Sequence, residues 1–386
     1  MKLLLVGAGG YALNYIKILL NQDLPATKWE GIVDPFYAAC KYKEQIDAAN
    51  IPVYDTMEAF YSRHTADLAI ICTPTYLHCE QSICALSNGS NVLCEKPAAP
   101  TVKEAEEMRE AEKKYGRFIA IGYQWSYSDA IQKLKADILS GALGKPEHFK
   151  TAISWPRNRA YYNRGGGWGG KITKDSRLVL DSIASNACAH YLHNMFFLLG
   201  DTMDAAASVS EVQAECYRAN EIENFDTCCI KMKTKGGTQL YFAATHAANQ
   251  NRNPEFVYVF QNGRVVFSQD EGSQIVAEFH DGSRKVYGDP FKNGFQKLWD
   301  CIDAVKNGNV PICTVQTALA HVRLIEGIYQ TTPIYDFAKD SICIDRETDT
   351  VFVNGLYESL YAAYEKECLF SELSGAVFSC CKVIAL

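Results

Sequence analysis

The first twenty residues place the strongest constraint on the fold, because an apolar run leads directly into a glycine-rich turn. Leu3–Val6 is followed by Gly7, Gly9 and Ala12 in the spacing G-x-G-x-x-A. Apolar residues at helical spacing then continue from Leu13 to Leu20. A strand, this turn and a helix in that order indicate the first part of a doubly wound sheet that binds a dinucleotide.

Each small residue of the turn has a physical reason to be there. Gly7 allows a tight turn, Gly9 lets the backbone approach a pyrophosphate, and Ala12 lets the helix pack closely on the strand. The first amides of the helix then face the phosphates. We therefore expect Gly7, Gly9, Gly10, Tyr11 and Ala12 to contact the cofactor. An ordinary loop between a strand and a helix is the alternative for the turn taken alone.

The second strand indicates which dinucleotide is bound. Gly31–Val33 ends at Asp34, about twenty residues past the glycines, where a carboxylate accepts hydrogen bonds from the adenosine ribose. That charge would repel a 2′-phosphate, and Pro35–Tyr37 supplies no arginine to bind one, although Lys41 and Lys43 lie nearby. The sequence predicts NAD rather than NADP.

Composition excludes several classes of protein. A chain of 386 residues, 48% apolar and 22% charged, is long enough for two domains with substantial cores. The net charge of −7 without a basic stretch argues against nucleic acid as a partner, and a small neutral or mildly polar ligand fits better. No apolar run approaches the roughly 20 residues that span a bilayer, so we expect no membrane partner and a cytoplasmic protein. The fifteen cysteines lack paired C-x-x-C spacing, which favours a reducing compartment without disulfides or metal.

Strand-like and helix-like stretches alternate up to about Gly122, including a capping box at Thr101–Glu104, and predict a parallel sheet. Beyond that point Gly236-Gly237, Asn262-Gly263 and Asp281-Gly282 indicate turns between antiparallel strands. Helices are expected at 130–140, 186–199, 295–307, 315–329 and 356–366, with a strand at 351–353. We predict an α/β chain: an N-terminal Rossmann domain with a doubly wound parallel sheet at residues 1–122, and a C-terminal α+β domain with a largely antiparallel open sheet at residues 123–386 that binds substrate.

A lysine follows the fifth expected strand, in the sequence Glu95-Lys96-Pro97 after Asn91–Cys94. Ligands of open α/β sheets bind at the carboxyl ends of the strands, so Lys96 falls beside the dinucleotide. Hydride transfer from a carbinol needs a base for the hydroxyl proton and a cation or donor for the developing alkoxide. Lys96 fits the second role, and a solvated loop lysine is the alternative.

A histidine fits the first role. Helical spacing places Asn186, His190 and His193 on one polar side at i, i+4 and i+7, while Leu192 and Phe196 face the core. Histidine is suited to proton transfer at neutral pH, and a hydrogen-bonded structural histidine is the alternative for His190. No carboxylate or cysteine set completes a metal site around the two histidines.

The segment from Trp155 to Lys171 interleaves aromatic residues, arginines and glycines. Aromatic faces and guanidinium groups suit a hydroxylated ring, so Arg157, Tyr162, Arg164 and Trp168 are candidate contacts to a sugar or cyclitol, together with Asn186 and His193. A mobile surface loop that closes an oligomer interface is the equal alternative.

Taken together, these residues resemble the Gfo/Idh/MocA family, the group of glucose-fructose oxidoreductase and inositol dehydrogenase. The resemblance covers the glycine turn, the stretch Cys72–His78, the Glu95-Lys96-Pro97 motif and the helix bearing His190. It implies that Lys96 contacts the reacting hydroxyl and His190 is the acid/base. It further implies a homodimer or homotetramer and cofactor contacts from Thr73, Pro74, His78, Glu95 and Lys96.

One residue departs from the family pattern, because many members carry an aspartate where this chain has Asn186. His190 then works without a carboxylate partner, or Asp181 reaches in. The leading hypothesis is an NAD-dependent oxidoreductase acting on a secondary hydroxyl of a sugar, glycoside or cyclitol. A glycoside-cleaving enzyme that uses transient oxidation and elimination, and a non-catalytic sugar or nucleotide sensor, are the alternatives.

Overall fold

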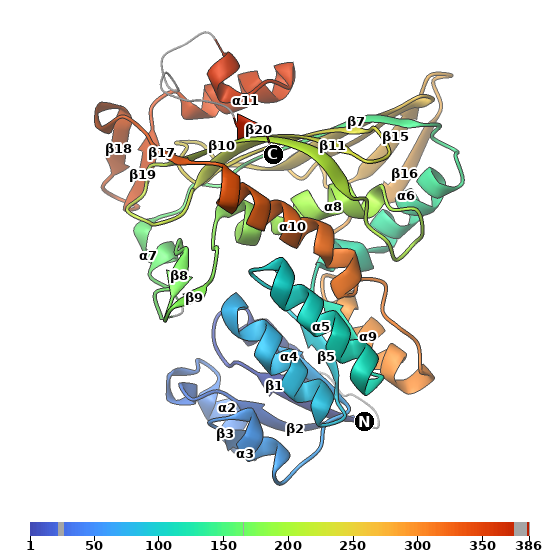
Figure 1. The fold of residues 1–386 in the computed structure, drawn as a ribbon, viewed down its shortest axis with the longest axis vertical. Coiled ribbons are helices and arrows are strands. Elements are labelled where there is room, and N and C mark those ends of the chain that lie inside the picture. Colours follow the sequence, from blue (N-terminus) through green and yellow to red (C-terminus); the bar gives the residue numbers. More distant parts are fainter. Residues whose placement is uncertain (22–26, 165, 374–383, 386) are drawn as a thin grey trace. The chain divides into compact units, whose positions relative to one another are not determined.

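The computed structural model describes residues 1–21, 27–164, 166–373 and 384–385 (Figure 1). The chain forms two compact units. The first consists of Met1–Tyr123 and Phe295–Val322, and the second of Gln124–Gly294 and Arg323–Leu386. The described helices include none long and apolar enough to cross a membrane.

A six-stranded parallel sheet forms the centre of the first unit, in the order β3-β2-β1-β4-β5-β6. This is the strand order of the doubly wound dinucleotide-binding fold, and it confirms the predicted Rossmann domain. The order reverses between β1 and β4, which is where such sheets bind their ligand. The strands are β1 (Lys2–Val6), β2 (Lys28–Val33), β3 (Val53–Tyr54), β4 (Leu68–Ile71), β5 (Asn91–Cys94) and β6 (Ile119–Ile121).

Helices connect these strands, and local sequence fixes where they begin and end. Thr101 caps α5 by accepting a hydrogen bond from the Glu104 amide at 3.2 Å, and Gly116 ends the helix in the left-handed region with φ of 62°. Thr101 thus caps the start of α5 where the sequence predicts it, and its hydroxyl also donates to Glu104 Oε2 at 2.6 Å. The helices of this unit are α1 (Ala12–Asn21), α2 (Lys43–Ala48), α3 (Met57–Tyr61), α4 (His78–Ser87), α5 (Val102–Tyr115), α9 (Gln296–Asn307) and the first part of α10 (Val315–Thr331).

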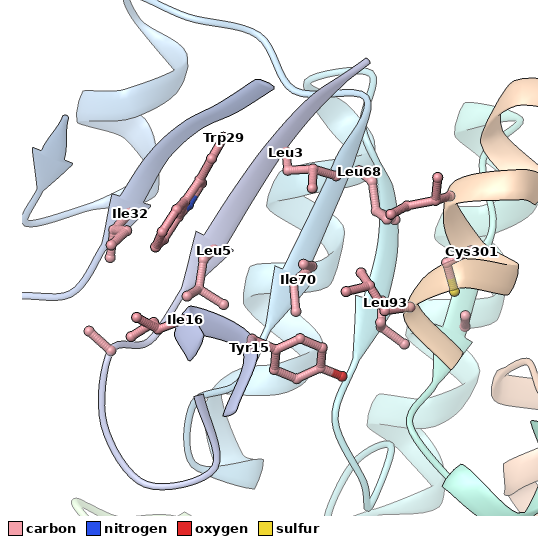
Figure 2. Close-up of a cluster of buried hydrophobic side chains, with 14 of the residues drawn as sticks. Leu3, Leu5, Tyr15, Ile16, Trp29, Ile32, Leu68, Ile70, Leu93 and Cys301 are labelled. Carbon is pink, nitrogen blue, oxygen red and sulfur yellow. The ribbon is translucent and has the colours of Figure 1, made fainter. Parts of the chain in front are cut away.

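The return of α9 to the first unit differs from the predicted division at residue 122, which assigned this helix to the second domain. Leu298 and Cys301 of α9 are fully buried in one apolar cluster with Leu93 of β5 and with Tyr15 and Ile16 of α1 (Figure 2). The apolar face of α9 therefore completes the core of the parallel sheet. Local sequence could not show this, because more than 200 residues separate Leu93 from Cys301.

A ten-stranded mixed sheet forms the centre of the second unit, in the order β16-β15-β14-β13-β7-β12-β11-β10-β17, with β20 also paired to β10. Only the β7–β12 and β10–β17 pairs are parallel among those described, so the predicted, largely antiparallel sheet is confirmed. Its strands are β7 (Pro146–Ser154), β10 (Val209–Arg218), β11 (Thr227–Thr234), β12 (Gln239–Thr245), β13 (Arg252–Phe260), β14 (Gly263–Ser268), β15 (Ile275–Phe279), β16 (Arg284–Gly288), β17 (Ile334–Asp336) and β20 (Ile384–Ala385).

The three glycine turns predicted from the sequence join β11 to β12, β13 to β14 and β15 to β16, and all three pairs are antiparallel. Helices of this unit are α6 (Asp129–Leu139), α7 (Arg159–Tyr162), α8 (Ala189–Leu198), α11 (Leu356–Lys366) and the last part of α10. Two short ribbons complete it, β8 (Thr173–Lys174) with β9 (Arg177–Leu178), and β18 (Ile342–Asp345) with β19 (Thr350–Val353).

The packing of α9 leads to a test of the division into units. Leu298→Ala should lower the free energy of unfolding by about 2–5 kcal/mol, because it leaves a cavity in the core of the parallel sheet. Urea denaturation measures this loss. Val310→Ala, at a side chain that is 69% exposed, is the control and should change the free energy by less than about 0.5 kcal/mol. Equal small effects would contradict the placement of α9.

Candidate active site

The glycine turn has the geometry that its sequence predicts. β1 ends at Val6 and α1 begins at Ala12, which is fully buried. Gly7 has φ of 97°, and a Cβ atom there would lie 2.8 Å from the carbonyl oxygen of Cys72, so no larger residue fits. Around Gly9, by contrast, a Cβ would meet no described atom within 4 Å, which leaves room beside the backbone for a phosphate.

Asp34 joins the glycine turn to the end of β2. Its Oδ2 accepts a hydrogen bond from the Ala8 amide at 2.6 Å, and its Oδ1 accepts one from the Phe36 amide at 2.7 Å. A carboxylate has about four lone-pair sites, so these two bonds leave capacity for ribose hydroxyls. The partly exposed side chain is thus held in one orientation at the edge where the sequence predicts an adenosine ribose.

The stretch after β4 contributes Thr73, Pro74 and His78. The Thr73 hydroxyl donates to Gln81 Oε1 at 2.5 Å. His78 is buried, with Nδ1 2.9 Å from the Pro97 carbonyl oxygen and Nε2 2.9 Å from the Thr73 carbonyl oxygen. Burial lowers the pKa of His78 despite these carbonyl neighbours. His78 therefore ties the loops after β4 and β5 together.

A buried ion pair lies directly behind the Glu95-Lys96-Pro97 motif. Lys297 of α9 is fully buried, and its Nζ donates to Glu95 Oε1, to the Gly122 carbonyl at 3.3 Å and to the Tyr11 hydroxyl at 3.4 Å. The Tyr15 hydroxyl donates to the same carboxylate oxygen at 2.7 Å. Burial opposes the charge of Lys297, but the Glu95 carboxylate more than offsets it and raises the pKa of this lysine.

This cluster also fixes Tyr11, the aromatic residue of the glycine turn. The Tyr11 ring stacks on Phe295 with centroids 6.1 Å apart, and Lys297 Nζ lies 4.6 Å from the Tyr11 centroid. Burial is the main cause that raises the pKa of Tyr11, so the phenol stays neutral near pH 7. Sequence reasoning missed Phe295 and Lys297, because nothing local links them to the turn.

Lys96 itself follows β5 and is partly exposed. Its backbone amide lies 3.3 Å from Glu95 Oε2, and the Lys96-Pro97 peptide bond is cis. The ion pair of Glu95 and Lys297 therefore fixes the backbone from which the Lys96 side chain projects, at the carboxyl end of the parallel sheet where the sequence predicts it.

In the second unit, the expected helix over 186–199 begins differently from the prediction. A π-helical turn spans Ile183–Ala187, Cys188 is not helical, and α8 begins at Ala189. The regular spacing from Asn186 to His190 is thus interrupted, and π-helical turns often occur at functional sites. The expectation of one shared polar side is wrong.

His193 shows the consequence of this interruption. It is 1% exposed, its Nε2 lies 3.2 Å from the Ser126 hydroxyl, and its ring stacks on Phe197. His193 is a core histidine rather than a residue poised to contact a ligand, whereas His190 is partly exposed. Within the described part of the chain, no three His, Cys, Asp or Glu side chains gather as a metal site.

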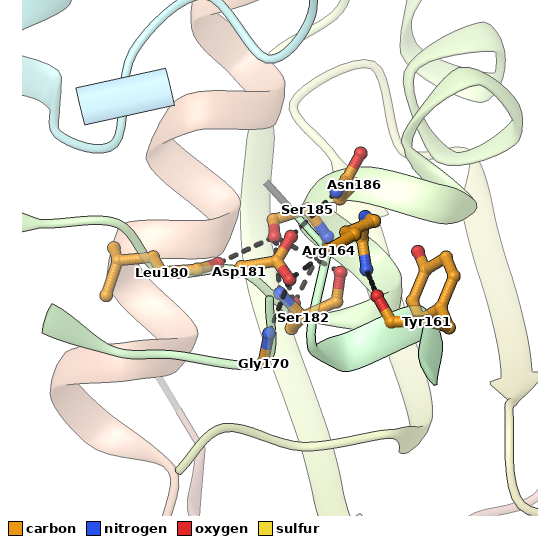
Figure 3. Close-up of polar contacts among 8 residues, drawn as sticks. All are labelled: Tyr161, Arg164, Gly170, Leu180, Asp181, Ser182, Ser185 and Asn186. Atoms are coloured by element: carbon orange, nitrogen blue, oxygen red, sulfur yellow. Dashed lines mark hydrogen bonds and ion pairs between the residues drawn. The ribbon is translucent and has the colours of Figure 1, made fainter. Parts of the chain in front are cut away.

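Asp181 organises the polar groups around Asn186 (Figure 3). Its buried carboxylate accepts a hydrogen bond from the Asn186 amide nitrogen at 2.7 Å and one from the Gly170 amide at 2.6 Å. Arg164 lies 3.8 Å from the same carboxylate. Because only the NH₂ of Asn186 can donate to a carboxylate, its Oδ1 points away from Asp181, as Figure 3 shows. Asp181 thus fixes the orientation of the Asn186 side chain.

The arginines of the loop after β7 lie on aromatic rings. Arg157 is placed over Trp155 at 5.3 Å and Tyr161 at 5.2 Å, and Arg164 over Tyr161 at 3.6 Å and Trp168 at 5.0 Å. Arg157, Arg164 and Trp168 are partly exposed. They therefore present a row of guanidinium and aromatic groups. Arg164 in this row lies near Asp181, which also binds the Asn186 side chain.

Tyr162 lies at the edge of this row but is 9% exposed, beside the buried His246. Burial and the two guanidinium groups lower the pKa of His246 to about 3, so this histidine is neutral. His246 was not foreseen from the sequence, because it lies beyond β12, far along the chain from the loop.

The fold and the glycine turn define a dinucleotide-binding protein, and comparison with known families identifies its kind. Residues 1–123 match the model of the oxidoreductase family with an NAD-binding Rossmann fold, GFO_IDH_MocA, and residues 131–266 match the GFO/IDH/MocA C-terminal domain. The chain belongs to the GFO/IDH/MocA oxidoreductase family. The resemblance inferred from the sequence is confirmed, as is NAD as the cofactor.

Individual relatives are more distant. A D-glucoside 3-dehydrogenase of Escherichia coli is 31% identical over 25% of this chain and 27% of its own length. A 2,7-anhydro-N-acetylneuraminate hydratase of Mediterraneibacter gnavus is 27% identical over 40% of this chain and 42% of its own, so the chain spans less than half the length of either relative. The WlbA dehydrogenase from Chromobacterium violaceum, solved with NADH and UDP-GlcNAcA, shares the fold with a TM-score of 0.73 and 21% identity over 86% of this chain and 93% of its own.

The position of Asp34 leads to a test of cofactor preference. Asp34→Asn should lower the ratio of the NADPH to the NADH dissociation constant by about tenfold, because it removes the charge that repels a 2′-phosphate. Fluorescence titration with both reduced cofactors measures this ratio. The exposed Asp55→Asn is the control, and an unchanged ratio in Asp34→Asn would show that the preference is set elsewhere.

The buried ion pair leads to a second test. Lys297→Met should lower the free energy of unfolding by about 3–5 kcal/mol, because it leaves the Glu95 carboxylate buried without its cation. The double variant Glu95→Gln with Lys297→Met should recover most of that loss, as measured by urea denaturation at pH 7. Because the pKa of Lys297 is raised, the stability that its charge contributes is complete at neutral pH and is lost only as the pH rises through that pKa. Additive losses in the double variant would contradict this coupling.

Proposed function

We propose that the protein transfers a hydride between NAD and a secondary hydroxyl of a sugar, glycoside or cyclitol. The observation that carries this proposal is Lys96, a partly exposed lysine at the carboxyl end of the parallel sheet of an NAD-binding unit, with its backbone anchored by the pair of Glu95 and Lys297. The name of the E. coli relative, a D-glucoside 3-dehydrogenase, supports a sugar hydroxyl as the reacting group.

The proposed roles follow from the chemistry of the side chains. Oxidation of the alcohol moves a hydride from carbon to the nicotinamide, which NAD supplies when it is bound. The ammonium group of Lys96 stabilises the negative charge that develops on the substrate oxygen. His190 accepts the hydroxyl proton, so the products are a ketone and a protonated imidazole. Asn186, held by Asp181, presents its Oδ1 as an acceptor for a neighbouring hydroxyl.

The name of one relative favours a second candidate. The M. gnavus protein is called a hydratase, and adding or removing water involves no net oxidation. A transient ketone would acidify the adjacent C–H, a leaving group would be eliminated, and the hydride would then return to the substrate. The same lysine and histidine serve this route. Release of an aglycone without net accumulation of NADH distinguishes it from a dehydrogenase.

We further propose that the protein is cytoplasmic and forms a homodimer or homotetramer through the large mixed sheet of the second unit. Size-exclusion chromatography with light scattering checks the oligomeric state.

The test of the proposed function is the nicotinamide absorbance of the protein with NAD or NADH and a panel of monosaccharides, inositols, keto sugars and glycosides. Lys96→Ala should reduce turnover by about 10²- to 10³-fold, since one charge-stabilising donor is lost. Lys103→Ala, at a lysine that is 84% exposed on α5, is the matched control and should leave turnover unchanged. Rates near those of the unmodified protein in Lys96→Ala would remove Lys96 from the mechanism.

A further inference from the structure

The partners of the arginines after β7 differ in a way that points to the substrate. Arg159 forms an ion pair with Asp349 at 3.1 Å, and Arg164 lies 3.8 Å from Asp181. Among the described residues, Arg157 has no carboxylate within ion-pair distance, and its side chain donates only to the Pro156 carbonyl, at 3.5 Å. Its Nε is buried and has no acceptor within hydrogen-bond distance in the described chain.

The surroundings of Arg157 hold its guanidinium group in place without neutralising it. The Trp155 and Tyr161 rings lie 5.3 and 5.2 Å from its central carbon. Aromatic rings stabilise a guanidinium group through their faces but accept none of its in-plane hydrogen bonds. The N–H edge of Arg157 therefore keeps its capacity for a planar, bidentate acceptor.

The neighbouring charges do not offset this cation. Asp181 is shared by Arg164, Asn186 and Gly170, and Glu223 pairs with Lys171. His246, which lies close to both guanidinium groups, is neutral because its pKa is lowered to about 3. The loop thus carries one net positive charge that is half-buried, and a half-buried cation gains from an anionic partner.

From this geometry we infer that the substrate carries an anionic group, a carboxylate or a phosphate, which Arg157 binds through its guanidinium edge. This inference rests on the proposed function for the identity of the site, and it refines the substrate from a neutral sugar to an acidic one. Arg164 and Trp168 continue the same row toward Asn186, so the hydroxylated ring would lie beyond the anion. Arg157 then sets specificity by charge and leaves the redox step to other residues.

The experiment measures binding, so that it does not depend on turnover. D-glucuronate, D-glucose 6-phosphate and D-glucose are titrated calorimetrically into the full-length protein loaded with NADH, using the unmodified protein, Arg157→Gln, Arg157→Lys and Arg159→Gln. Arg159 is the matched control, since it lies in the same loop but its charge is already paired. Thermal melting of each variant shows that it is folded.

The expected result is that one anionic probe binds the unmodified protein more tightly than glucose, with the carboxylate and phosphate arms showing which group is recognised. Arg157→Gln should weaken binding of that probe by about 10- to 100-fold and leave glucose unaffected, because a hydrogen-bonded charge pair is lost. The affinity of Arg157→Lys for that probe should lie between those of the unmodified protein and Arg157→Gln, since lysine keeps the charge but lacks the planar, bidentate donor edge of a guanidinium group. The affinity of Arg159→Gln should match that of the unmodified protein.

Two results would overturn the inference. One is that neither anionic probe binds more tightly than glucose. The other is that Arg157→Gln weakens the anionic probes and glucose equally. Failure of the proposed function looks different: charge-selective binding that depends on Arg157 would persist, while no probe would change the nicotinamide absorbance in a manner that depends on Lys96.

Discussion

The buried ion pair between Glu95 and Lys297 is the interaction on which the NAD-binding unit depends. It joins the end of β5 to a helix about 200 residues further along the chain, and the same cluster holds the Tyr11 ring and the Tyr15 hydroxyl. Removing two charges from water is costly, and such a pair stabilises a protein only when further hydrogen bonds satisfy both partners. Here Gly122, Tyr11 and Tyr15 supply those bonds. The glycine turn, the Lys96 backbone and α9 are therefore fixed as one rigid arrangement.

Asp181 has a comparable place in the second unit. A single buried carboxylate gathers the Gly170 amide, the Asn186 side chain and the Arg164 guanidinium group. The bond to Asn186 ties the π-helical turn Ile183–Ala187, which precedes α8, to the segment before it. Family resemblance places an aspartate where this chain has Asn186. In this chain the negative charge lies instead on Asp181, which binds the Asn186 side chain, and an oriented amide occupies the position of the aspartate. In the proposed reaction, a neutral acceptor at that position would bind a substrate hydroxyl without competing with His190 for a proton.

The features that the sequence predicts correctly are those set by local chemistry. The glycine turn, the Thr101 cap and the three glycine hairpins each depend on residues within a few positions of one another, and the structure contains all of them. The features that the sequence does not reveal or places wrongly depend on distant contacts. Lys297 gains its partner only when α9 returns to the sheet, and His193 is drawn into the core by Ser126 and Phe197. A helical spacing rule cannot foresee a π-helical turn, because the extra residue is stabilised by side-chain bonds such as those of Ser182 and Ser185.

The net charge of the whole chain and the net charge of one loop predict different kinds of ligand. A net charge of −7 argues against a polyanion that must contact many cations at once. It does not predict the charge of a ligand that contacts only one loop, because the net charge of that loop depends on which carboxylates pair with its arginines. Asp349 and Glu223 neutralise their own neighbours, and Asp181 is shared among three donors. Whether the loop favours a neutral or an anionic ligand therefore depends on which of its arginines are paired with a carboxylate. Only the folded chain shows this pairing.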